Sequence, residues 1–340
     1  MVVNLNPLDK RTNLLHELQD SGTKVMVVLE NFAREIAAIK DKLPNLNVLT
    51  TQVGDLLPWL KRHMVNTVIK YIKHQVPSFK MSTTPLLQAL ELGAKAPLKL
   101  PSLTEQDIAF LQYTGGTTGK AKGVVLTHGN IVSNVKQLHE WGQHVFGEDD
   151  VAMTPLPLYH IFSLTVNCFM VYCKGGSNVL IPNPRDFKSF VKVLGSRPYT
   201  LLTGVNTLFN ALLQNKKFVE QDFSKLKTVI AGGMAMQKPV ADQWREVTGV
   251  TICQGYGLTE ASPVVCVSPL PTTEFNGSIG LPIPSTIVSI RDENDEPVPL
   301  GEKGEVCVMG PQVMLGYWRR EAKTQEVLHH GWLHTGDIGY

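Results

Sequence analysis

The sequence predicts an α/β protein built from doubly wound βαβ subdomains, with a smaller β-rich subdomain at its carboxyl end. Short β-branched runs alternate with segments of helical spacing over most of the chain, which is typical of βαβ units. From Ser278 onward the apolar runs are short and turns are frequent, which favours a separate β-rich part. The length of 340 residues also exceeds that of a typical single domain. We therefore expect the α/β body in residues 1–270 and the β-rich subdomain in residues 271–340.

The predicted strands of the body are short apolar runs, of the kind found in sheets buried on both faces. In chain order they are Lys24–Leu29, Asn47–Thr51, Asp107–Gln112, Val124–Thr127, Asp150–Thr154, Ser177–Leu180, Tyr199–Thr203, Lys227–Ala231 and Val250–Gln254. Helical spacing predicts the segments that separate several of them, namely Asn31–Lys42, Asn130–Trp141, Lys188–Leu194, Val205–Gln214 and Pro239–Thr248. In the β-rich subdomain we expect strands at Ser285–Arg291 and Gly304–Met309.

Charge, cysteine spacing and hydropathy exclude several classes of protein. A net charge of +2 gives no basis for a nucleic-acid partner. The five cysteines show neither C-x-x-C nor metal-ligand spacing, which is typical of reduced thiols in the cytosol. The first residues carry no basic segment followed by an apolar core, so we expect no signal peptide. The longest apolar run, Ile161–Cys173, is too short to span a bilayer and predicts a buried element. We therefore predict a cytoplasmic protein.

Residues Trp59–Val76 predict a basic amphipathic helix. On a helical wheel, one half is apolar and the other polar, and Lys61 alone breaks the apolar half. The apolar half holds Leu60, Met64, Val65, Val68, Ile69, Ile72 and Val76, and the polar half Arg62, His63, Asn66, Lys70, Lys73 and His74. Such a helix can lie on an anionic membrane, which would place the protein peripherally at the inner membrane surface. The alternative, and the commoner case, is a helix packed on the protein's own core with its basic face in solvent.

The stretch Tyr113–Gly123 is the strongest functional signal in the chain, since it holds four glycines, three threonines and two lysines. Glycine-rich backbone can approach a ligand closely, and successive amide N–H groups form a concavity that binds anions. Threonine hydroxyls add donors and lysine adds positive charge. The spacing differs from the P-loop and from the dinucleotide fingerprint. A flexible surface loop is the alternative. The density of hydroxyls favours a polyphosphate site.

Further polar clusters follow predicted strands, where ligands of open α/β sheets bind. Gln254–Glu260 offers two glycines, the flat ring of Tyr256 and a carboxylate at Glu260 for Mg²⁺. The alternative for Glu260 is an ordinary acid at a helix start. Ala231-Gly-Gly could hold the edge of a flat base, although a simple turn explains it equally well. No G-x-S-x-G and no H-E-x-x-H segment occurs.

Two single residues are also candidates. His160, in Leu156-Pro-Leu-Tyr-His160, could line a substrate pocket, although a histidine among apolar residues is more often structural. Asp337, in His334-Thr-Gly-Asp337, could accept hydrogen bonds from two ribose hydroxyls, although Gly-Asp is also a turn signal. Each of these signals is weak when it is taken alone.

Taken together, these motifs resemble the adenylate-forming superfamily, which includes acyl-CoA synthetases, luciferases and the adenylation domains of peptide synthetases. The ordered motifs that carry the resemblance are Tyr113–Gly123, Pro157–His160, Tyr256–Glu260, Gly304–Tyr317 and Thr335–Asp337. The wider sequence is most similar to bacterial long-chain fatty acid–CoA ligases, in the segments Phe110–Gly119, Pro155–Phe162, Thr203–Leu213, Ser278–Ser285, Gly310–Trp318 and Gly331–Ile338. The resemblance covers essentially the whole chain. It implies the large domain of an adenylate-forming enzyme, with a distorted barrel-like β-rich part.

The resemblance assigns roles to individual residues. The ATP phosphates would be held by Thr114, Gly115, Gly116, Thr117, Thr118, Gly119 and the loop lysine Lys122. The adenine would lie against Gly232, Gly233, Gly255 and the ring of Tyr256, with Gly257 in the same segment. Asp337 would bind the ribose, and His160 would lie near the acyl carboxylate. Thr259 would face the α-phosphate and Glu260 would hold Mg²⁺, so that Thr117, Lys122, Thr259 and Glu260 form the catalytic set. Ala121 replaces the proline frequent in this loop.

The implied reaction is ATP-dependent activation of a fatty acid to acyl-AMP, followed by thioester formation with coenzyme A. The expected ligands are thus ATP, Mg²⁺, a fatty acid and coenzyme A. The expected assembly includes a homodimer as one possibility. The family's small C-terminal domain, which supplies a catalytic lysine, does not follow Tyr340. We therefore expect a fragment with poor turnover. The alternatives are a ligase for an aryl or amino acid, and a nucleotide-binding fragment without catalysis.

Overall fold

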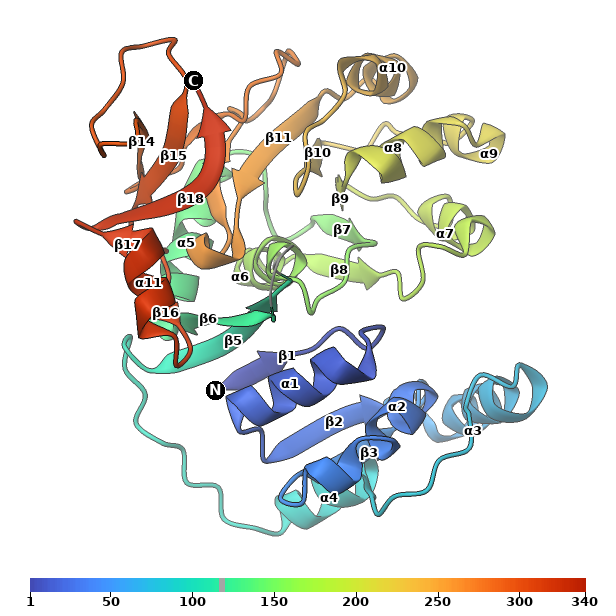
Figure 1. Ribbon diagram of the computed structural model, residues 1–340. Helices are drawn as coiled ribbons and strands as arrows, with labels where there is room; N and C mark the ends of the chain where they lie inside the picture. Colours follow the sequence, from blue (N-terminus) through green and yellow to red (C-terminus); the bar gives the residue numbers. More distant parts are fainter. Residues whose placement is uncertain (116–119) are drawn as a thin grey trace. The chain divides into compact units, whose positions relative to one another are not determined.

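The structure is a computed structural model that describes residues 1–115 and 120–340 (Figure 1). The chain forms two compact units, which we call the large unit and the small unit. The large unit comprises Met1–Asn4, Thr104–Gln112 and Val124–Tyr340, and the small unit comprises Leu5–Leu103 and Tyr113–Gly123. The expected division into residues 1–270 and 271–340 stays a prediction.

The main sheet of the large unit has seven strands in the order β13-β12-β11-β10-β9-β7-β8. They are β7 (Val151–Thr154), β8 (Ser177–Leu180), β9 (Leu201–Gly204), β10 (Thr228–Ala231), β11 (Ile252–Gly257), β12 (Val264–Val267) and β13 (Leu281–Pro282). Strands β8, β7, β9, β10 and the first half of β11 run parallel, whereas β12 and β13 are antiparallel to their neighbours.

Helices cover both faces of this sheet. They are α5 (His128–Trp141), the π-helical η4 (Ser163–Met170), α6 (Val171–Cys173), α7 (Phe187–Leu194), α8 (Asn206–Leu213), α9 (Lys216–Val219) and α10 (Lys238–Thr248). One core packs Phe190, Phe209 and Trp244, from α7, α8 and α10, on one face of the strands. The other packs residues of α5 and η4 on the opposite face. Figure 1 shows α7, α8 and α10 together on one side of β9–β11 and α5 on the other.

The alternation of side chains within the strands explains the two cores. Met153 and Leu202 face the core of α7, α8 and α10, whereas their neighbours Ala152 and Leu201 face α5 and η4. Successive residues of a strand point to opposite faces, so a strand that is apolar throughout can be buried on both. The doubly wound arrangement follows from this pattern.

Two four-stranded sheets complete the large unit. One has the order β14-β15-β18-β17 and is antiparallel, with β14 (Ile287–Arg291), β15 (Gly304–Met309), β17 (Leu328–His329) and β18 (Trp332–Gly339). The other has the order β1-β5-β6-β16, with β1 (Val2–Asn4), β5 (Ile108–Thr114), β6 (Lys122–Thr127) and β16 (Gly316–Tyr317); the ends Tyr113–Thr114 and Lys122–Gly123 belong to the small unit. Two short helices, η5 (Thr259–Ala261) and α11 (Glu321–Val327), lie in the connections.

The small unit is a three-stranded parallel sheet, in the order β2-β3-β4, with its own core. Its elements are α1 (Arg11–Ser21), β2 (Val25–Leu29), η1 (Glu30–Phe32), α2 (Ala33–Ala37), η2 (Lys40–Lys42), β3 (Asn47–Thr51), α3 (Trp59–Thr67), the π-helical η3 (Val68–Ile72), β4 (Thr84–Pro85) and α4 (Leu86–Ala94). The predicted helix Asn31–Lys42 is broken into short pieces. Ile39 N donates to Ile36 O, three residues earlier, so tight 3-10 turns replace the α-helix there.

The predicted amphipathic helix Trp59–Val76 is α3 continued by η3, and its apolar half is divided. Val65 and Ile69 are partly buried within the small unit, whereas Leu60, Met64 and Ile72 are exposed. The polar half also turns partly inward, since Asn66 bonds to Gly54 and Asp55, and Lys70 pairs with Glu30. A wheel drawn for one ideal helix could not predict this division. In the described residues, no helix combines the length and the apolar character that crossing a bilayer requires.

Glu17 is a buried acid in α1, with only 4% of its surface exposed. Burial, followed by the charge of Asp9, raises the pKa of Glu17 from 4.5 to about 7. Between these two values the carboxyl group is ionised in the unfolded chain and protonated in the folded one. Stability from this group is therefore complete below about pH 4.5 and is lost as the pH rises towards 7.

In the parent chain, we expect the free energy of unfolding to fall between pH 4.5 and 7 because of Glu17. We predict that this fall is absent in Glu17→Gln. The slope it removes is at most ~1.4 kcal/mol per pH unit, because one proton is released on unfolding. Chemical denaturation at a series of pH values measures it. Glu91→Gln, at an exposed position of α4, is the matched control and should leave the slope unchanged. Identical pH profiles for Glu17→Gln and the parent chain would contradict the assignment.

Candidate functional site

The candidate site lies where β11 changes its partner. Residues Ile252–Gln254 pair in parallel with β10, whereas Gly255–Gly257 pair antiparallel with β12, with a bulge between Tyr256 and Gly257. Because β10 ends at Ala231, Gly255–Gly257 extend past its carboxyl end. The carboxyl ends of parallel strands are where open α/β sheets bind ligands.

The glycines at this edge are required for different reasons. A Cβ atom on Gly257 would lie 2.1 Å from the carbonyl oxygen of Pro263, and one on Gly232 would lie 3.0 Å from the ring of Phe162. The protein's own packing therefore explains both residues. Gly233 has a φ of +77°, which favours glycine through backbone conformation. Gly255 differs, because its nearest neighbour would be 3.8 Å away, at ordinary contact distance. Packing leaves Gly255 free to serve a ligand that approaches the backbone.

Tyr256 and Asp337 are in direct contact, although 81 residues separate them in the chain. The Tyr256 hydroxyl donates to Oδ2 of Asp337 at 2.7 Å. Burial, together with the hydrogen bond to this carboxylate, raises the pKa of Tyr256, so the phenol stays protonated and acts as the donor. The Asp337 backbone N donates to Thr335 Oγ1, which itself donates to the carbonyl of Val306 on β15. The structure thus brings together two residues assigned to the same nucleoside.

Glu260 is fixed at both its backbone and its side chain. Its carbonyl oxygen accepts from Met314 N at 2.7 Å, and its carboxylate accepts from the Tyr317 hydroxyl at 2.7 Å. Burial and the Glu260 charge raise the pKa of Tyr317, which keeps this phenol a donor. Thr259 and Glu260 form the short helix η5 directly after β11. The acid therefore lies on the same chain segment as Tyr256, four residues further on.

A buried amide network stands behind this segment, and the sequence analysis missed it. Thr165 donates to the carbonyl of Ser262, and the Ser262 hydroxyl donates to the carbonyl of Gln312. Asn134 pairs with both backbone groups of Val264. The amide groups of Gln137 and Gln312 join each other and Thr286, as a further part of the same network. Buried polar groups that are fully paired favour one conformation, so the network fixes the turn that presents Glu260.

His160 lies in the loop after β7, close to the glycine edge. Phe162 N donates to His160 Nδ1 at 3.3 Å, and the Phe162 ring is the group nearest to Gly232. This hydrogen bond makes Nδ1 an acceptor and leaves the proton on Nε2. Loss of hydration lowers the pKa of His160, even though one edge of the residue is exposed. The imidazole is therefore neutral at neutral pH and can donate from Nε2.

The phosphate-loop residues divide between described and undescribed parts of the chain. Gly116, Thr117, Thr118 and Gly119 lie outside the described residues. Thr114 ends β5, Gly115 follows it, and Lys122 begins β6; all three belong to the small unit. On either side of the loop, Tyr113 donates to Asp20, and Ala121 O lies 3.0 Å from His16 Nε2. Helix α1 thus holds both ends of the loop. The other assigned residues belong to the large unit.

Residues 1–318 match the family model described as AMP-binding enzyme. A long-chain-fatty-acid–CoA ligase of Escherichia coli is 47% identical over an alignment of 340 positions, which covers 99% of this chain and 61% of that protein. The ligase of the same name from Haemophilus influenzae is 45% identical over 342 residues, again 99% of this chain and 61% of the relative. The chain therefore spans about three fifths of the length of these relatives.

Solved structures of two enzymes share the fold of this chain. Apo MatB from Rhodopseudomonas palustris matches with a TM-score of 0.78 and 25% identity, over 99% of this chain and 60% of that one. An anthranilate CoA ligase, AuaEII, solved with anthranoyl-AMP, matches with a TM-score of 0.80 and 24% identity over the same shares. These matches confirm the predicted fold class.

We predict that Gly257→Ala lowers the free energy of unfolding by about 1–3 kcal/mol, because the added methyl group overlaps the Pro263 carbonyl. Chemical denaturation followed by circular dichroism measures the change. Gly255→Ala is the matched control on the same strand and should change stability by less than ~1 kcal/mol. Equal losses in the two variants would show that packing requires both glycines alike.

Proposed function

Because the chain belongs to the AMP-binding enzyme family, we propose that it is the part of a long-chain fatty acid–CoA ligase that binds ATP and the fatty acid. The complete protein would be an AMP-forming acid–thiol ligase that makes acyl-AMP and then acyl-CoA. One observation carries the proposal for this chain. The segment that passes the end of β10 presents Gly255, Tyr256 and Glu260 in succession, and Asp337 meets it from β18.

The nucleoside would lie against this segment. Gly255 has room for close approach of a base to the backbone, and Tyr256 offers the face of its ring. Asp337 is an acceptor with two oxygens, which suits the two hydroxyls of a ribose. The Tyr256 hydroxyl already donates to one of these oxygens, so the carboxylate is held in place before the nucleotide binds. Gly232 and Gly233, at the end of β10, would flank the base from the neighbouring strand.

The donor set at Glu260 suits Mg²⁺ bound to a nucleotide. Magnesium prefers one or two carboxylates together with phosphate oxygens and water. Glu260 supplies one partly exposed carboxylate, and Tyr317 holds one of its oxygens at 2.7 Å. When bound, the ion would neutralise charge on the phosphates. The family resemblance assigns Thr259 to the α-phosphate, and it assigns Thr114, Gly115 and Lys122 to phosphate binding together with loop residues that lie outside the described part of the chain.

The first half-reaction needs no general base from this chain. A fatty carboxylate with a pKa of about 4–5 is already ionised at neutral pH and can attack the α-phosphorus of ATP directly. The chain's task is to orient the two reactants and to stabilise charge on the phosphates. His160 is neutral and carries its proton on Nε2, so it can donate a hydrogen bond to the acyl carboxylate without trapping it in an ion pair. Coenzyme A would then displace AMP in the complete protein.

We predict that Glu260→Ala slows pyrophosphate release from ATP and palmitate at least ~10-fold in the complete protein, since one charge-stabilising group is lost. In the 340-residue chain the same change should weaken ATP binding in the presence of Mg²⁺. Glu246→Ala, at an exposed position of α10, is the matched control. Pyrophosphate release at the parental rate would refute the metal role of Glu260.

The same assay separates the rival substrates. Acetate, octanoate, palmitate, benzoate and glycine, tested in parallel, distinguish a fatty acid ligase from an aryl or amino acid ligase. Calorimetry measures whether the complete protein binds ATP. If it binds ATP but forms no product with any of these acids, the protein is a nucleotide-binding protein without catalysis. The identity of about 45–47% with long-chain ligases supports the fatty acid.

A second proposal concerns the exposed side of α3 and η3, and its partner is an anionic membrane surface. Leu60, Met64 and Ile72 are 61–73% exposed, and Lys61 and Lys73 are exposed beside them. No acidic residue occurs between Asp55 and Glu91, so every charged side chain of this stretch is basic. Exposed apolar side chains flanked by lysine are typical of helices that lie in the headgroup region.

The expectation that the protein forms a homodimer stays a prediction.

We predict that Lys61→Glu with Lys73→Glu reduces cosedimentation of the chain with vesicles containing phosphatidylglycerol, because each lysine near an anionic surface contributes about 1 kcal/mol. Lys70 is left unchanged since it pairs with Glu30. Lys216→Glu with Lys217→Glu, on the exposed side of α9, is the control for net charge. Equal binding by both double variants, or no binding by the parent chain, would contradict the proposal.

A further inference from the structure

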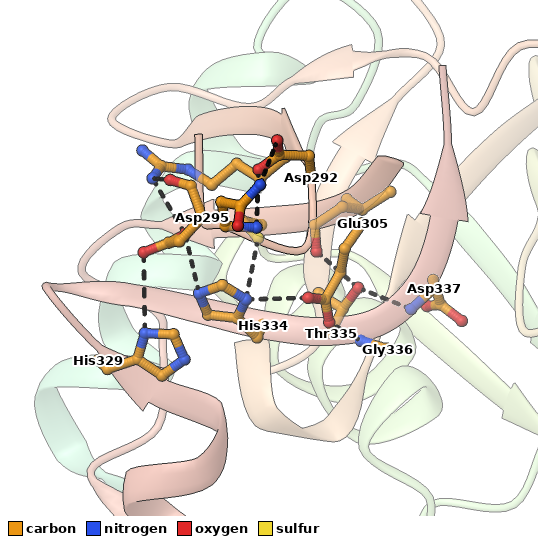
Figure 2. A network of polar contacts seen from close by, with 12 residues as sticks. Asp292, Asp295, Glu305, His329, His334, Thr335, Gly336 and Asp337 are labelled. Atoms are coloured by element: carbon orange, nitrogen blue, oxygen red, sulfur yellow. Dashed lines mark hydrogen bonds and ion pairs between the residues drawn. The ribbon is translucent and has the colours of Figure 1, made fainter. Parts of the chain in front are cut away.

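A cluster of potential metal ligands lies on the antiparallel sheet β14-β15-β18-β17, apart from the residues assigned to ATP (Figure 2). The side chains come from four short segments within residues 295–334, namely Asp295, Glu305, Cys307, His329 and His334. Figure 2 shows Asp295 facing both histidines, with Glu305 on the other side of His334. The sequence analysis missed this cluster, although His329 and His334 stand at the H-x-x-x-x-H spacing that zinc ligands can have; Asp295 and Glu305 stand at no standard ligand spacing from them.

We propose that Asp295, His329 and His334 bind a divalent transition-metal ion, with zinc as the best fit. His334 Nε2 lies 3.4 Å from Asp295 Oδ1, and His329 Nδ1 lies 3.9 Å from Asp295 Oδ2. The ligand atoms of the three residues all lie within 4.8 Å of one another. A tetrahedral zinc ion with bonds of about 2.0–2.1 Å places its ligand atoms about 3.3 Å apart. The His329 ring is stacked on that of His334, with the ring centroids 3.9 Å apart, so His329 turns out of this stack when it completes the set. Water can fill the fourth position.

Glu305 gives His334 the orientation of a metal ligand. The carboxylate of Glu305 lies 2.9 Å from His334 Nδ1, so the ring donates its proton to Glu305 from this nitrogen. In the neutral ring the lone pair is then on Nε2, and this atom is buried with no hydrogen-bond partner among the residues that the structure describes. Nε2 faces the carboxylate of Asp295, and this pair is stabilised when a proton or a metal ion lies between the two atoms. A carboxylate that orients a histidine towards a metal in this way is common in zinc sites.

Asp295 is held in position before any ion binds. Its φ is +63°, and its backbone N donates to Asp292 O at 3.1 Å in a tight turn. Arg291 Nη1 donates to the carbonyl oxygen of Asp295 at 2.7 Å and to Oδ1 at 3.1 Å. The Arg291 guanidinium also lies 4.3 Å above the ring of Trp332. This arrangement fixes the carboxylate, while the charge of Arg291 offsets part of the two nearby acids.

Cys307 belongs to the cluster, but it lies beside Nδ1 of His334 and not beside Nε2, the nitrogen that faces Asp295. Its Sγ is 3.4 Å from His334 Nδ1, the nitrogen that Glu305 already contacts. A set of Glu305, Cys307 and His334 would therefore need Nδ1 as the metal ligand. The two sets differ in one measurable respect, because only the second binds the ion through sulfur.

The test uses the 340-residue chain without a polyhistidine tag, stripped with a chelator and titrated with Zn²⁺ against a chromophoric competitor. We expect one ion per chain. His329→Ala and Asp295→Ala should each raise the Kd at least ~10-fold, and Glu305→Gln should raise it about 10–100-fold through the orientation of His334. His330→Ala, at the neighbouring exposed histidine, is the matched control and should leave the Kd unchanged.

Cobalt(II) reports the ligands directly. We expect visible bands of a four-coordinate ion without a thiolate charge-transfer band, and loss of these bands in His329→Ala. His329 lies at the edge of the sheet with 37% of its side chain exposed, so this variant should keep its fold, which circular dichroism checks. The proposal is overturned if no stoichiometric binding occurs, if His329→Ala binds like the parent chain, if His330→Ala loses as much affinity as His329→Ala, or if a thiolate band is present.

Discussion

The change of partner along β11 is the constraint on which the candidate site depends. As long as β11 pairs with β10, its backbone is occupied by the parallel ladder. After Gln254 the strand pairs with β12 alone on the antiparallel side, and a bulge turns it at Gly257. Gly257 lies so close to the Pro263 carbonyl that no side chain fits, so this backbone geometry requires glycine at position 257. Gly255 and Tyr256 are exposed to a ligand because of this exit from the sheet.

A buried polar network holds the segment that follows the bulge. Asn134 replaces a strand partner for Val264 by pairing with both its N–H and its carbonyl. Ser262 is fully buried; its carbonyl accepts from Thr165, its hydroxyl donates to Gln312 O, and its N–H donates to Thr259 O. Leaving any one of these groups unpaired would cost about 1–3 kcal/mol, so the turn has few alternative conformations. The position of Glu260 is therefore set by amides that have no part in the chemistry themselves.

The regular strands were the most predictable part of the fold. β3 and β15 begin and end at the predicted residues, and β10 differs by one residue, because β-branched runs with flanking turns define them. The helix predicted at Asn31–Lys42 was wrong in its continuity, since apolar spacing alone does not distinguish a helix from successive tight turns.

The candidate site was predictable only in its motifs. Tyr256, Glu260 and Asp337 stand in short recognisable segments, whereas the contact between Tyr256 and Asp337 depends on strand pairing across distant parts of the chain. Asn134, Gln137 and Gln312 gave a faint signal, as amides among apolar residues. The cluster at His334 gave only the spacing of His329 and His334, because Asp295, from the β14–β15 connection, and Glu305, from β15, meet these histidines only when the register is set.

The most direct test of the nucleotide site is a crystal structure of the chain with an acyl-AMP analogue. We expect the adenine on the ring of Tyr256 beside Gly255, both ribose hydroxyls within hydrogen-bond distance of Asp337, and the phosphate on the side of Glu260. A nucleotide bound away from the carboxyl end of β11, with Tyr256 and Asp337 still bonded to each other and untouched, would contradict the account.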